Sequence, residues 1–421
     1  MASHKRFVKN TFYQYAMQIA KYFFQFITLP YLTRVLGPDA FAVRVYVLSV
    51  MNFLQAFLDF GFNSYGIRAI AEARGNKDAE EQEMSAIELL RVVFCLIGAV
   101  ALVLLIQIIP MLKANQLYCW LAYLTICAKA TIPDFIFQGK EEMEVMTKRF
   151  VISESVATGL ILLVVHSAAD LVLVPSFELA GSVVALVWSW HYVFKHYGLS
   201  FKRVSREKIN AVVQSSFIFF IATAATTVFS SLTTVFLGLS MSHATPAEIS
   251  YWSIAVTASG AIQALYAPIA NSLYPHMVKN HDFGLLKTLL LIGMPVDIIG
   301  TVAFAMLSNL EMSILGGPEY LPGAYVMTLI APLFLFSFPA TLIGYPVLAA
   351  FGEDRKLTTS SVSAAIFNMV AITILLFTGN LTLRSACILR CCTEAVLLLV
   401  RVYYVVGLWR EHRGDASAAR A

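Results

Sequence analysis

The sequence contains little charge for its length. Asp, Glu, Lys and Arg make up 13% of its 421 residues, whereas 58% are hydrophobic and the mean hydropathy is +0.72. A water-soluble domain carries about twice that charged fraction. The composition therefore excludes a soluble globular enzyme and indicates a chain that lies mostly within a membrane.

The sequence also lacks the motifs of nucleotide, zinc and disulfide chemistry. Its single Gly-Lys pair, Gly139-Lys140, has Asp134 where a phosphate-binding loop requires its first glycine. The six cysteines lie in apolar stretches without C-x-x-C spacing, and the eight histidines form no H-E-x-x-H pattern. We therefore expect buried free thiols, no bound metal, no cofactor and no ATP hydrolysis.

Long apolar runs dominate what is present. A helix needs about 20 apolar residues to cross a bilayer, and lipid cannot satisfy the free backbone groups of an open strand. The sequence therefore predicts an all-α polytopic membrane protein of about twelve transmembrane helices. The expected spans are 11–33, 39–63, 91–110, 117–137, 149–166, 171–194, 212–239, 249–270, 285–307, 324–350, 357–378 and 384–407.

The 30 basic residues are distributed unevenly between the expected loops. With the N-terminus inside, 21 fall on the cytoplasmic side, four on the other side and five within spans. This bias predicts a multi-pass protein of the bacterial cytoplasmic (inner) membrane with both termini in the cytoplasm. The net charge of +4 is then a topology signal rather than a nucleic-acid-binding patch, and we expect no nucleic-acid partner.

Two stretches 200 positions apart look alike. YLTRVLGPDAF begins at Tyr31 and SLTTVFLG at Ser231, and in both a helix is expected to end at Gly before the chain restarts with Pro. A duplication would give two six-helix lobes, residues 1–200 and 201–421, facing the same way around a central cavity. The alternative is chance similarity between apolar segments. The repeat favours a transporter over a membrane-embedded enzyme.

The first expected span carries polar residues at spacings of three and four, which place them on one helix face. They are Asn10, Gln14, Gln18, Lys21, Gln25 and Thr28. The second span carries a similar series that includes Asp59. These side chains could join helices to one another, or they could line a wet surface.

Lys21 and Lys129 lie within expected spans. An uncompensated lysine near mid-membrane costs about 2.5–3.5 kcal/mol, so we expect each to face a cavity, a partner or a ligand. Together with Arg34 they would attract an anion such as a phosphate or pyrophosphate. The glutamines Gln14, Gln18 and Gln25 suit a hydroxyl-rich ligand. Asp59 is expected to titrate or to pair with one of the cations.

The first seventy residues resemble a known family. ITLPYLTRVLGPDAF followed by LDFGFNSYGIRAIAEARG is similar to the polysaccharide-biosynthesis (Wzx-type, O-antigen) flippases of the multidrug/oligosaccharidyl-lipid/polysaccharide exporter superfamily. Weaker similarities, such as DFIFQGKEEM and LGGPEYLPGAYVM, continue along the chain. The matched positions are Pro30, Arg34, Gly37, Gly61, Arg68 and Gly139. The chain departs from the pattern at Phe41-Ala42, which Arg44 follows.

The resemblance implies a function without covalent chemistry. Such a flippase moves undecaprenyl-pyrophosphate-linked oligosaccharide units of an O-antigen, capsule or exopolysaccharide from the inner to the outer leaflet by alternating access. Arg34 would then lie near the outer mouth. Implied partners are the lipid-linked oligosaccharide, membrane lipids, a polysaccharide polymerase and a chain-length regulator.

Two other functions stay open. A drug/cation antiporter of the same superfamily would want acidic residues in its cavity, and the lysines argue against it. A membrane-embedded polysaccharide polymerase usually has a large external loop, which this sequence lacks.

Overall fold

The computed structural model is all-helical in the part of the chain that it describes. It describes the backbone of residues 2–240 and 245–418, and the side chains of these ranges except residues 2–8, 222–232, 280 and 411–418. The chain forms two compact units, Met1–Thr227 and Val228–Ala421. The division falls within one helix, α9 (Arg206–Leu239).

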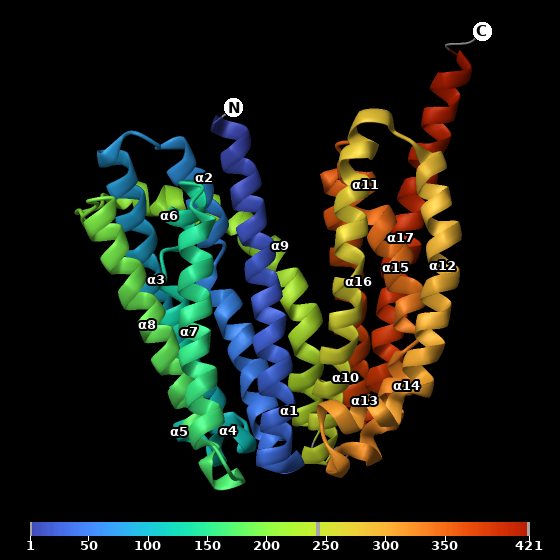
Figure 1. Ribbon diagram of the computed structural model, residues 1–421, viewed down its shortest axis with the longest axis horizontal. Helices are drawn as coiled ribbons and strands as arrows, with labels where there is room; N and C mark the ends of the chain where they lie inside the picture. The colour runs from blue at the N-terminus through green and yellow to red at the C-terminus, as the bar shows by residue number, and fades with distance from the viewer. Residues whose placement is uncertain (1, 241–244, 419–421) are drawn as a thin grey trace. The chain divides into compact units, whose positions relative to one another are not determined.

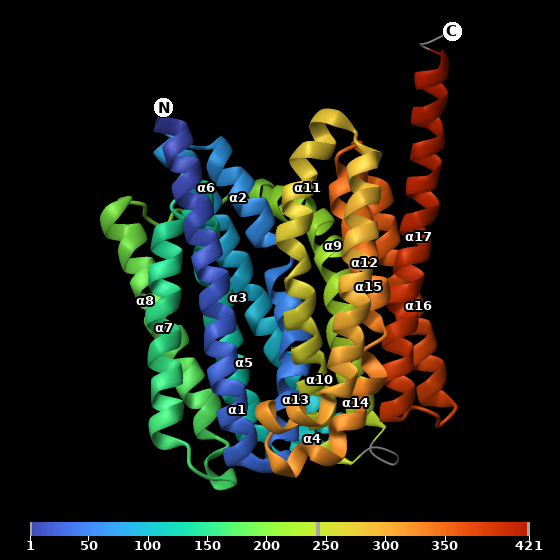
Figure 2. The ribbon, with the colours of Figure 1, turned by 45° about the vertical axis from the view of Figure 1, so that its right-hand side comes forward.

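Unit 1 contains nine helices and part of α9. In chain order they are α1 (Ala2–Asp59), α2 (Phe62–Glu72), α3 (Lys77–Ile108), α4 (Pro110–Ala114), α5 (Gln116–Ala130), α6 (Asp134–Gly139), α7 (Met143–Val164), the 3-10 helix η1 (Ala168–Asp170) and α8 (Leu173–His196). Both ribbon views show α7 and α8 lying side by side (Figures 1 and 2).

Unit 2 follows the end of α9. It contains α10 (Pro246–Ala264), α11 (Tyr266–Asn280), α12 (Phe283–Met306), α13 (Ser308–Leu315), η2 (Pro318–Gly323), α14 (Ala324–Ile330), α15 (Leu333–Ile343), the π-helical η3 (Gly344–Ala349), α16 (Asp354–Phe377) and α17 (Leu383–Ala418). Figure 2 shows α16 packed alongside α17.

The helix α1 is two helices joined at one residue. Gly37 has φ 69° and ψ 172°, which is not helical, and Pro38 follows it at the start of the second part. A positive φ suits glycine, and proline fits the first turn of a helix because its missing N–H would have no partner there. The expectation that Gly37 ends the first helix is therefore confirmed.

Gly61 shapes the turn between α1 and α2. Its φ is +75°, and a Cβ atom placed on it would lie 2.4 Å from the carbonyl oxygen of Ser216. The chain at this turn thus touches the backbone of α9, which leaves no room for a side chain. The matched position Gly61 has a steric reason in this fold.

In unit 1 the helices that surround the later site pack closely. The helix α7 lies against α8 and α1, and α5 lies against α8 and α1. The second part of α1 also reaches α3. Side chains from segments far apart in the sequence can therefore meet between α1, α5, α7 and α8.

In unit 2 the helix α15 is central, because α12, α11 and α17 all pack against it. Arg401 on α17 donates from Nη1 to the carbonyl oxygen of Ala340 at 2.8 Å. A Cβ on Gly344 would lie 2.5 Å from the same nitrogen. The guanidinium of Arg401 therefore fills the space beside the junction of α15 and the π-helix.

Eight helical segments of the described chain are long and apolar enough to cross a membrane, and a ninth is added if the bent pair Pro318–Ile330 and Leu333–Ala349 is one span. One of the eight, Lys9–Glu72, includes both of the first two expected spans. The helix α7 is not among them, because Lys148, Arg149 and Glu154 interrupt its apolar stretch. The all-α membrane fold is confirmed, and the number twelve stays a prediction.

The cysteines are unpaired in this structure, and their burial varies. Cys119, Cys387 and Cys391 are buried as expected. Cys392 is exposed, so the expectation that every thiol is buried was wrong for this residue. Its neighbour Cys391 occupies the inward position of the same helix turn, so Cys392 must point away from it.

Candidate functional site

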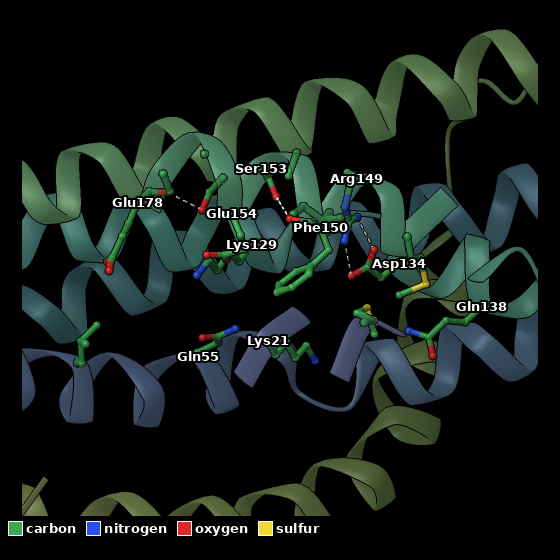
Figure 3. Close-up of a pocket in the computed structure, with 18 of the residues that line it drawn as sticks. Lys21, Gln55, Lys129, Asp134, Gln138, Arg149, Phe150, Ser153, Glu154 and Glu178 are labelled. Carbon is green, nitrogen blue, oxygen red and sulfur yellow. Dashed lines mark hydrogen bonds and ion pairs between the residues drawn. The ribbon is translucent and has the colours of Figure 1, made fainter. Parts of the chain in front are cut away.

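A polar pocket lies inside unit 1, with a volume of about 610 Å³. Its walls come from both parts of α1 and from α5, α6, α7 and α8. Figure 3 shows Lys21 and Gln55 on α1 facing Lys129 and Phe150. These helices carry apolar surfaces on their outer sides, so the charged side chains turn toward one another.

We expected Lys21 and Lys129 to face a cavity, and both line this pocket of unit 1. The central cavity expected between two lobes stays a prediction. Both lysine side chains are exposed to the pocket, and neither ammonium forms an ion pair among the described residues. The Nζ atom of Lys21 lies 5.9 Å from the centre of the Phe150 ring, within range of a weak cation–π contact. The two lysines therefore offer positive charge to a ligand.

Two other cations of the pocket wall are neutralised. Arg44 on α1 donates to Glu178 on α8, with Nη2 to Oε1 at 2.7 Å. Arg149 on α7 binds both carboxylate oxygens of Asp134 on α6, at 2.5 and 3.2 Å, and its Nη1 also reaches the hydroxyl of Ser189 at 3.1 Å. These paired groups fix the positions of the helices that hold them.

Glu154 on α7 is the third acid of the wall. It lies within electrostatic range of Lys129 and of Lys21, and it forms no ion pair among the described residues. After the two close pairs are set aside, the wall carries two lysines against this one carboxylate. The pocket retains a net positive charge of one, which favours an anionic ligand.

The neutral part of the wall can serve a hydroxyl-rich ligand. Gln55 and Gln138 supply amide donors and acceptors, and Ser153 and Ser182 supply hydroxyls. Both hydroxyls bond to backbone carbonyls of their own helices. Phe150 adds one apolar ring face, which can cover the carbon skeleton of a sugar.

Three of the other predicted residues lie on α1 outside the pocket wall. Gln14, Gln18 and Gln25 are exposed, at spacings that keep them on the helix face of Lys21. They are not among the lining residues of the pocket. Their role in substrate binding stays a prediction.

Arg34 and Asp59 also lie away from the pocket wall. The exposed Arg34 donates from Nη1 to the carbonyl oxygen of Pro30 at 2.9 Å. Asp59 has its nearest cation in Arg91 on α3, with Nη2 to Oδ1 at 3.9 Å. For Asp59 the expected pairing with Lys21, Lys129 or Arg34 is corrected, because its neighbour Arg91 comes from α3, which packs against α1. The alternative expectation, that Asp59 titrates, stays a prediction.

The sequence did not single out the Asp134–Arg149 pair. Arg149 was expected in a cytoplasmic loop at the edge of a span, but α7 begins six residues earlier at Met143 and buries it. The only available signal was a carboxylate and a guanidinium on either side of one short expected loop. Within the described residues no group of three or more His, Cys, Asp and Glu side chains could hold a metal ion.

Comparison with known proteins agrees with this architecture. In sequence, the chain is 23% identical over 371 residues to a protein of Escherichia coli (strain K12) named "Putative O-antigen transporter", covering 86% of this chain and 88% of the relative. In structure, it superposes on a multidrug resistance MATE family transporter of the MOP superfamily with a TM-score of 0.70, at 13% identity, covering 93% and 94% of the two chains.

A second solved structure has the same fold. Lipid II flippase MurJ superposes with a TM-score of 0.70, at 12% identity, covering 92% of this chain and 87% of that one. Identities this low establish the shared fold alone. The family follows from the sequence: the family model described as "Polysaccharide biosynthesis protein" matches residues 7–281, well over half of the chain. The chain belongs to the polysaccharide biosynthesis protein family.

Proposed function

We propose that this protein is a flippase that moves lipid-linked oligosaccharides across the bacterial cytoplasmic membrane. The single observation that carries this proposal is the presence of Lys21 and Lys129 in a polar pocket of a polysaccharide biosynthesis family member, where neither lysine forms an ion pair with any described residue. The name of the Escherichia coli relative supports an O-antigen substrate, and the fold shared with a lipid II flippase supports a lipid-linked one. The transport makes no covalent bond.

The substrate end that the pocket recognises is the pyrophosphate of the undecaprenyl carrier. Lys21 and Lys129 contact its oxygens together, because two ammonium groups bind a polyanion more strongly than one. Gln55 and Gln138 bind sugar hydroxyls, and the lipid tail stays in the bilayer. The polar path along α1 is extended by Gln14, Gln18 and Gln25. Arg34 assists at the outer mouth. Asp59, at the end of α1, adjusts the local charge.

The transport cycle is alternating access by two six-helix lobes, residues 1–200 and 201–421, with twelve spans in total. Both termini lie in the cytoplasm, as the 21-to-4 distribution of basic residues indicates. A polysaccharide polymerase and a chain-length regulator are the expected partners, because they use the units that a flippase delivers.

The test replaces the two lysines in a deletion strain. The double variant Lys21→Ala/Lys129→Ala abolishes surface polysaccharide while protein levels in the membrane persist, and single lipid-linked repeat units accumulate in the inner leaflet. Lys148→Ala is the matched control, since this exposed lysine on α7 pairs with Glu144 at 2.6 Å and does not line the pocket. Full surface polysaccharide in the double variant would reject the site.

The same strain separates the alternatives. Flipped but unpolymerised units outside the membrane would identify a polymerase. A drug/cation antiporter is supported by one observation, the carboxylate of Glu154 in the pocket of a chain that shares its fold with a multidrug transporter. In that case Glu154→Gln would remove resistance to a cationic drug, while the lysine variants would leave the resistance intact.

A further inference from the structure

Asp297 is an acid deep within a membrane helix of unit 2. It lies nine residues before the end of α12 at Met306, which is about 13 Å at 1.5 Å per residue. The helix α12 is one of the segments long and apolar enough to span a membrane. The carboxyl group of Asp297 therefore lies well inside the hydrocarbon region.

The side chain of Asp297 faces protein rather than lipid. One turn earlier on the same helix face, a Cβ on Gly293 would lie 2.3 Å from the ring of Phe338, so α12 and α15 touch there. The ring of Phe338 also contacts that of Tyr266, with 5.2 Å between centroids. On the outer side of α12, Val296 and Ile299 are exposed by 66% and 69%.

The carboxyl group of Asp297 has one hydrogen-bond partner among the described residues. The hydroxyl of Tyr266, at the start of α11, donates to Oδ1 at 2.7 Å. The second oxygen, Oδ2, is buried and has no partner in the described part of the chain. Thr301 bonds the backbone carbonyl of Asp297 and leaves the carboxyl group untouched.

Three other acids on long apolar helices each have a cation beside them. Glu394 has Arg390 at 3.1 Å, Glu178 has Arg44 at 2.7 Å, and Glu88 has Arg91 at 2.9 Å. Asp297 forms no ion pair among the described residues. Glu154 also forms no ion pair, but it lies within electrostatic range of Lys129 and Lys21, whereas no lysine or arginine of the described chain acts on Asp297. Asp297 therefore departs from the rule that intramembrane charges are compensated by an opposite charge.

No cation from the neighbouring helices compensates the carboxyl group of Asp297 in the described part of the chain. The helix α15 carries no ionisable side chain, α14 carries Tyr325 and α13 carries Glu311, and neither of these interacts with Asp297. From α11 it is Tyr266 that faces the carboxyl group, and from α17 the field of Glu394, itself paired with Arg390, reaches Tyr266.

We propose that Asp297 is a proton-binding site and that it carries a proton in the conformation described. An uncompensated ion at this depth costs several kcal/mol, whereas a neutral carboxyl group does not. A metal cation would need more oxygen ligands than this carboxylate and one tyrosine hydroxyl. The step is simple: the carboxyl group gives one proton to water and becomes a carboxylate when water reaches it.

Pro295 gives α12 a means to open this site. It lies two residues before Asp297, and its missing N–H leaves the carbonyl of Leu291 without its usual helical partner. A bend at this position would admit water to the carboxyl group. The use of the released proton to drive transport rests on the proposed flippase function, but proton binding itself does not.

Infrared difference spectroscopy of the purified protein tests the proposal directly. All samples carry Glu311→Gln, because burial raises the pKa of Glu311 to about 7 and its carboxyl group would titrate as well. During a pH titration, this background shows a carbonyl band of a protonated carboxylic acid that disappears as the proton is lost. Asp297→Asn removes this band, and Tyr266→Phe shifts it, since the carboxyl group loses its hydrogen bond. Asp59→Asn, whose carboxylate lies beside Arg91, is the matched control and keeps the band.

The two variants make the outcome decisive. If Asp297→Asn does not fold, the shift in Tyr266→Phe still reports the carboxyl group. An unchanged band in both variants, or displacement of the band by sodium at constant pH, overturns the proposal. The lysine variant Lys21→Ala/Lys129→Ala keeps the band, so failure of the flippase assignment and failure of the proton site give different results.

Discussion

Arg44 on the second part of α1 and Glu178 on α8 hold each other at 2.7 Å across the wall of the polar pocket. Their side chains are only 13% and 20% exposed, so water screens the pair weakly. The pair joins two helices that both contribute pocket residues.

A charge exchange should reveal this link. Arg44→Glu and Glu178→Arg each place like charges side by side and lower the thermal unfolding temperature in detergent. The double variant Arg44→Glu/Glu178→Arg recovers most of the loss, with a coupling energy of about 1–3 kcal/mol. Additive losses in the double variant would show that the pair does not hold the helices together.

The Asp134–Arg149 pair should be more sensitive to truncation. Arg149→Met leaves the carboxylate of Asp134 without its two-point partner and lowers the free energy of unfolding by about 3 kcal/mol. Arg68→Met is the matched control, because Arg68 pairs with Glu72 at 2.7 Å where both side chains are more than half exposed. Its loss costs below about 1 kcal/mol. Equal losses in denaturant titrations would contradict the burial argument.

Gly61 can be tested against another glycine of positive φ. Gly61→Ala adds backbone strain and a clash with the Ser216 carbonyl, so it destabilises unit 1 by more than about 2 kcal/mol. Gly75→Ala has a similar φ of +90° but open space around it, and it costs about 1 kcal/mol. The difference between the two unfolding midpoints measures the contact of the turn with α9, and no difference would disprove it.

Glu311 on α13 makes stability depend on pH. Burial raises the pKa of Glu311 from 4.5 to about 7, and its Oε2 has no partner among the described residues. The folded state therefore keeps a proton that the unfolded state has lost. The contribution of Glu311 to the free energy of unfolding is largest below pH 4.5. It falls as the pH rises and is lost above about pH 7.

Glu311→Gln should remove this part of the pH dependence. The variant unfolds at a higher temperature than the wild type at about pH 8 and at the same temperature at about pH 4. Thermal unfolding followed by fluorescence at both pH values measures the effect. Asp282→Asn is a contrasting control, because hydrogen bonds to the backbone N–H of Leu285 hold the pKa of Asp282 below its ordinary value. Parallel curves for Glu311→Gln and wild type would contradict the assignment.

The sequence identified Lys21 and Lys129 because a lysine within an apolar run is conspicuous. The free energy of inserting a charged lysine into the bilayer is enough to predict that it faces a cavity, without any knowledge of the neighbouring helices. The same reasoning found Gly37, since Gly followed by Pro ends a helix wherever it occurs. Features of one helix were therefore predictable.

Pairs between helices were not predictable in the same way. Asp59 lies near Arg91, and Asp134 binds Arg149, because of how α1 meets α3 and α6 meets α7. Helical periodicity within one span carries no information about the neighbour's register. The number of spans stays open for a related reason: α7 has charges in its apolar stretch, and one of them, Arg149, is compensated by Asp134 on another helix, α6.

The guanidinium of Arg401 links α17 to the junction of α15 with the π-helix η3. Moving the guanidinium out of this position would leave its positive charge unsolvated in an apolar interior. It would also leave the carbonyl oxygen of Ala340 without its hydrogen-bond donor. We therefore expect α15 and α17 to move as one rigid body during any rearrangement of unit 2. Flexing is left to helices such as α12, whose proline already interrupts its backbone ladder.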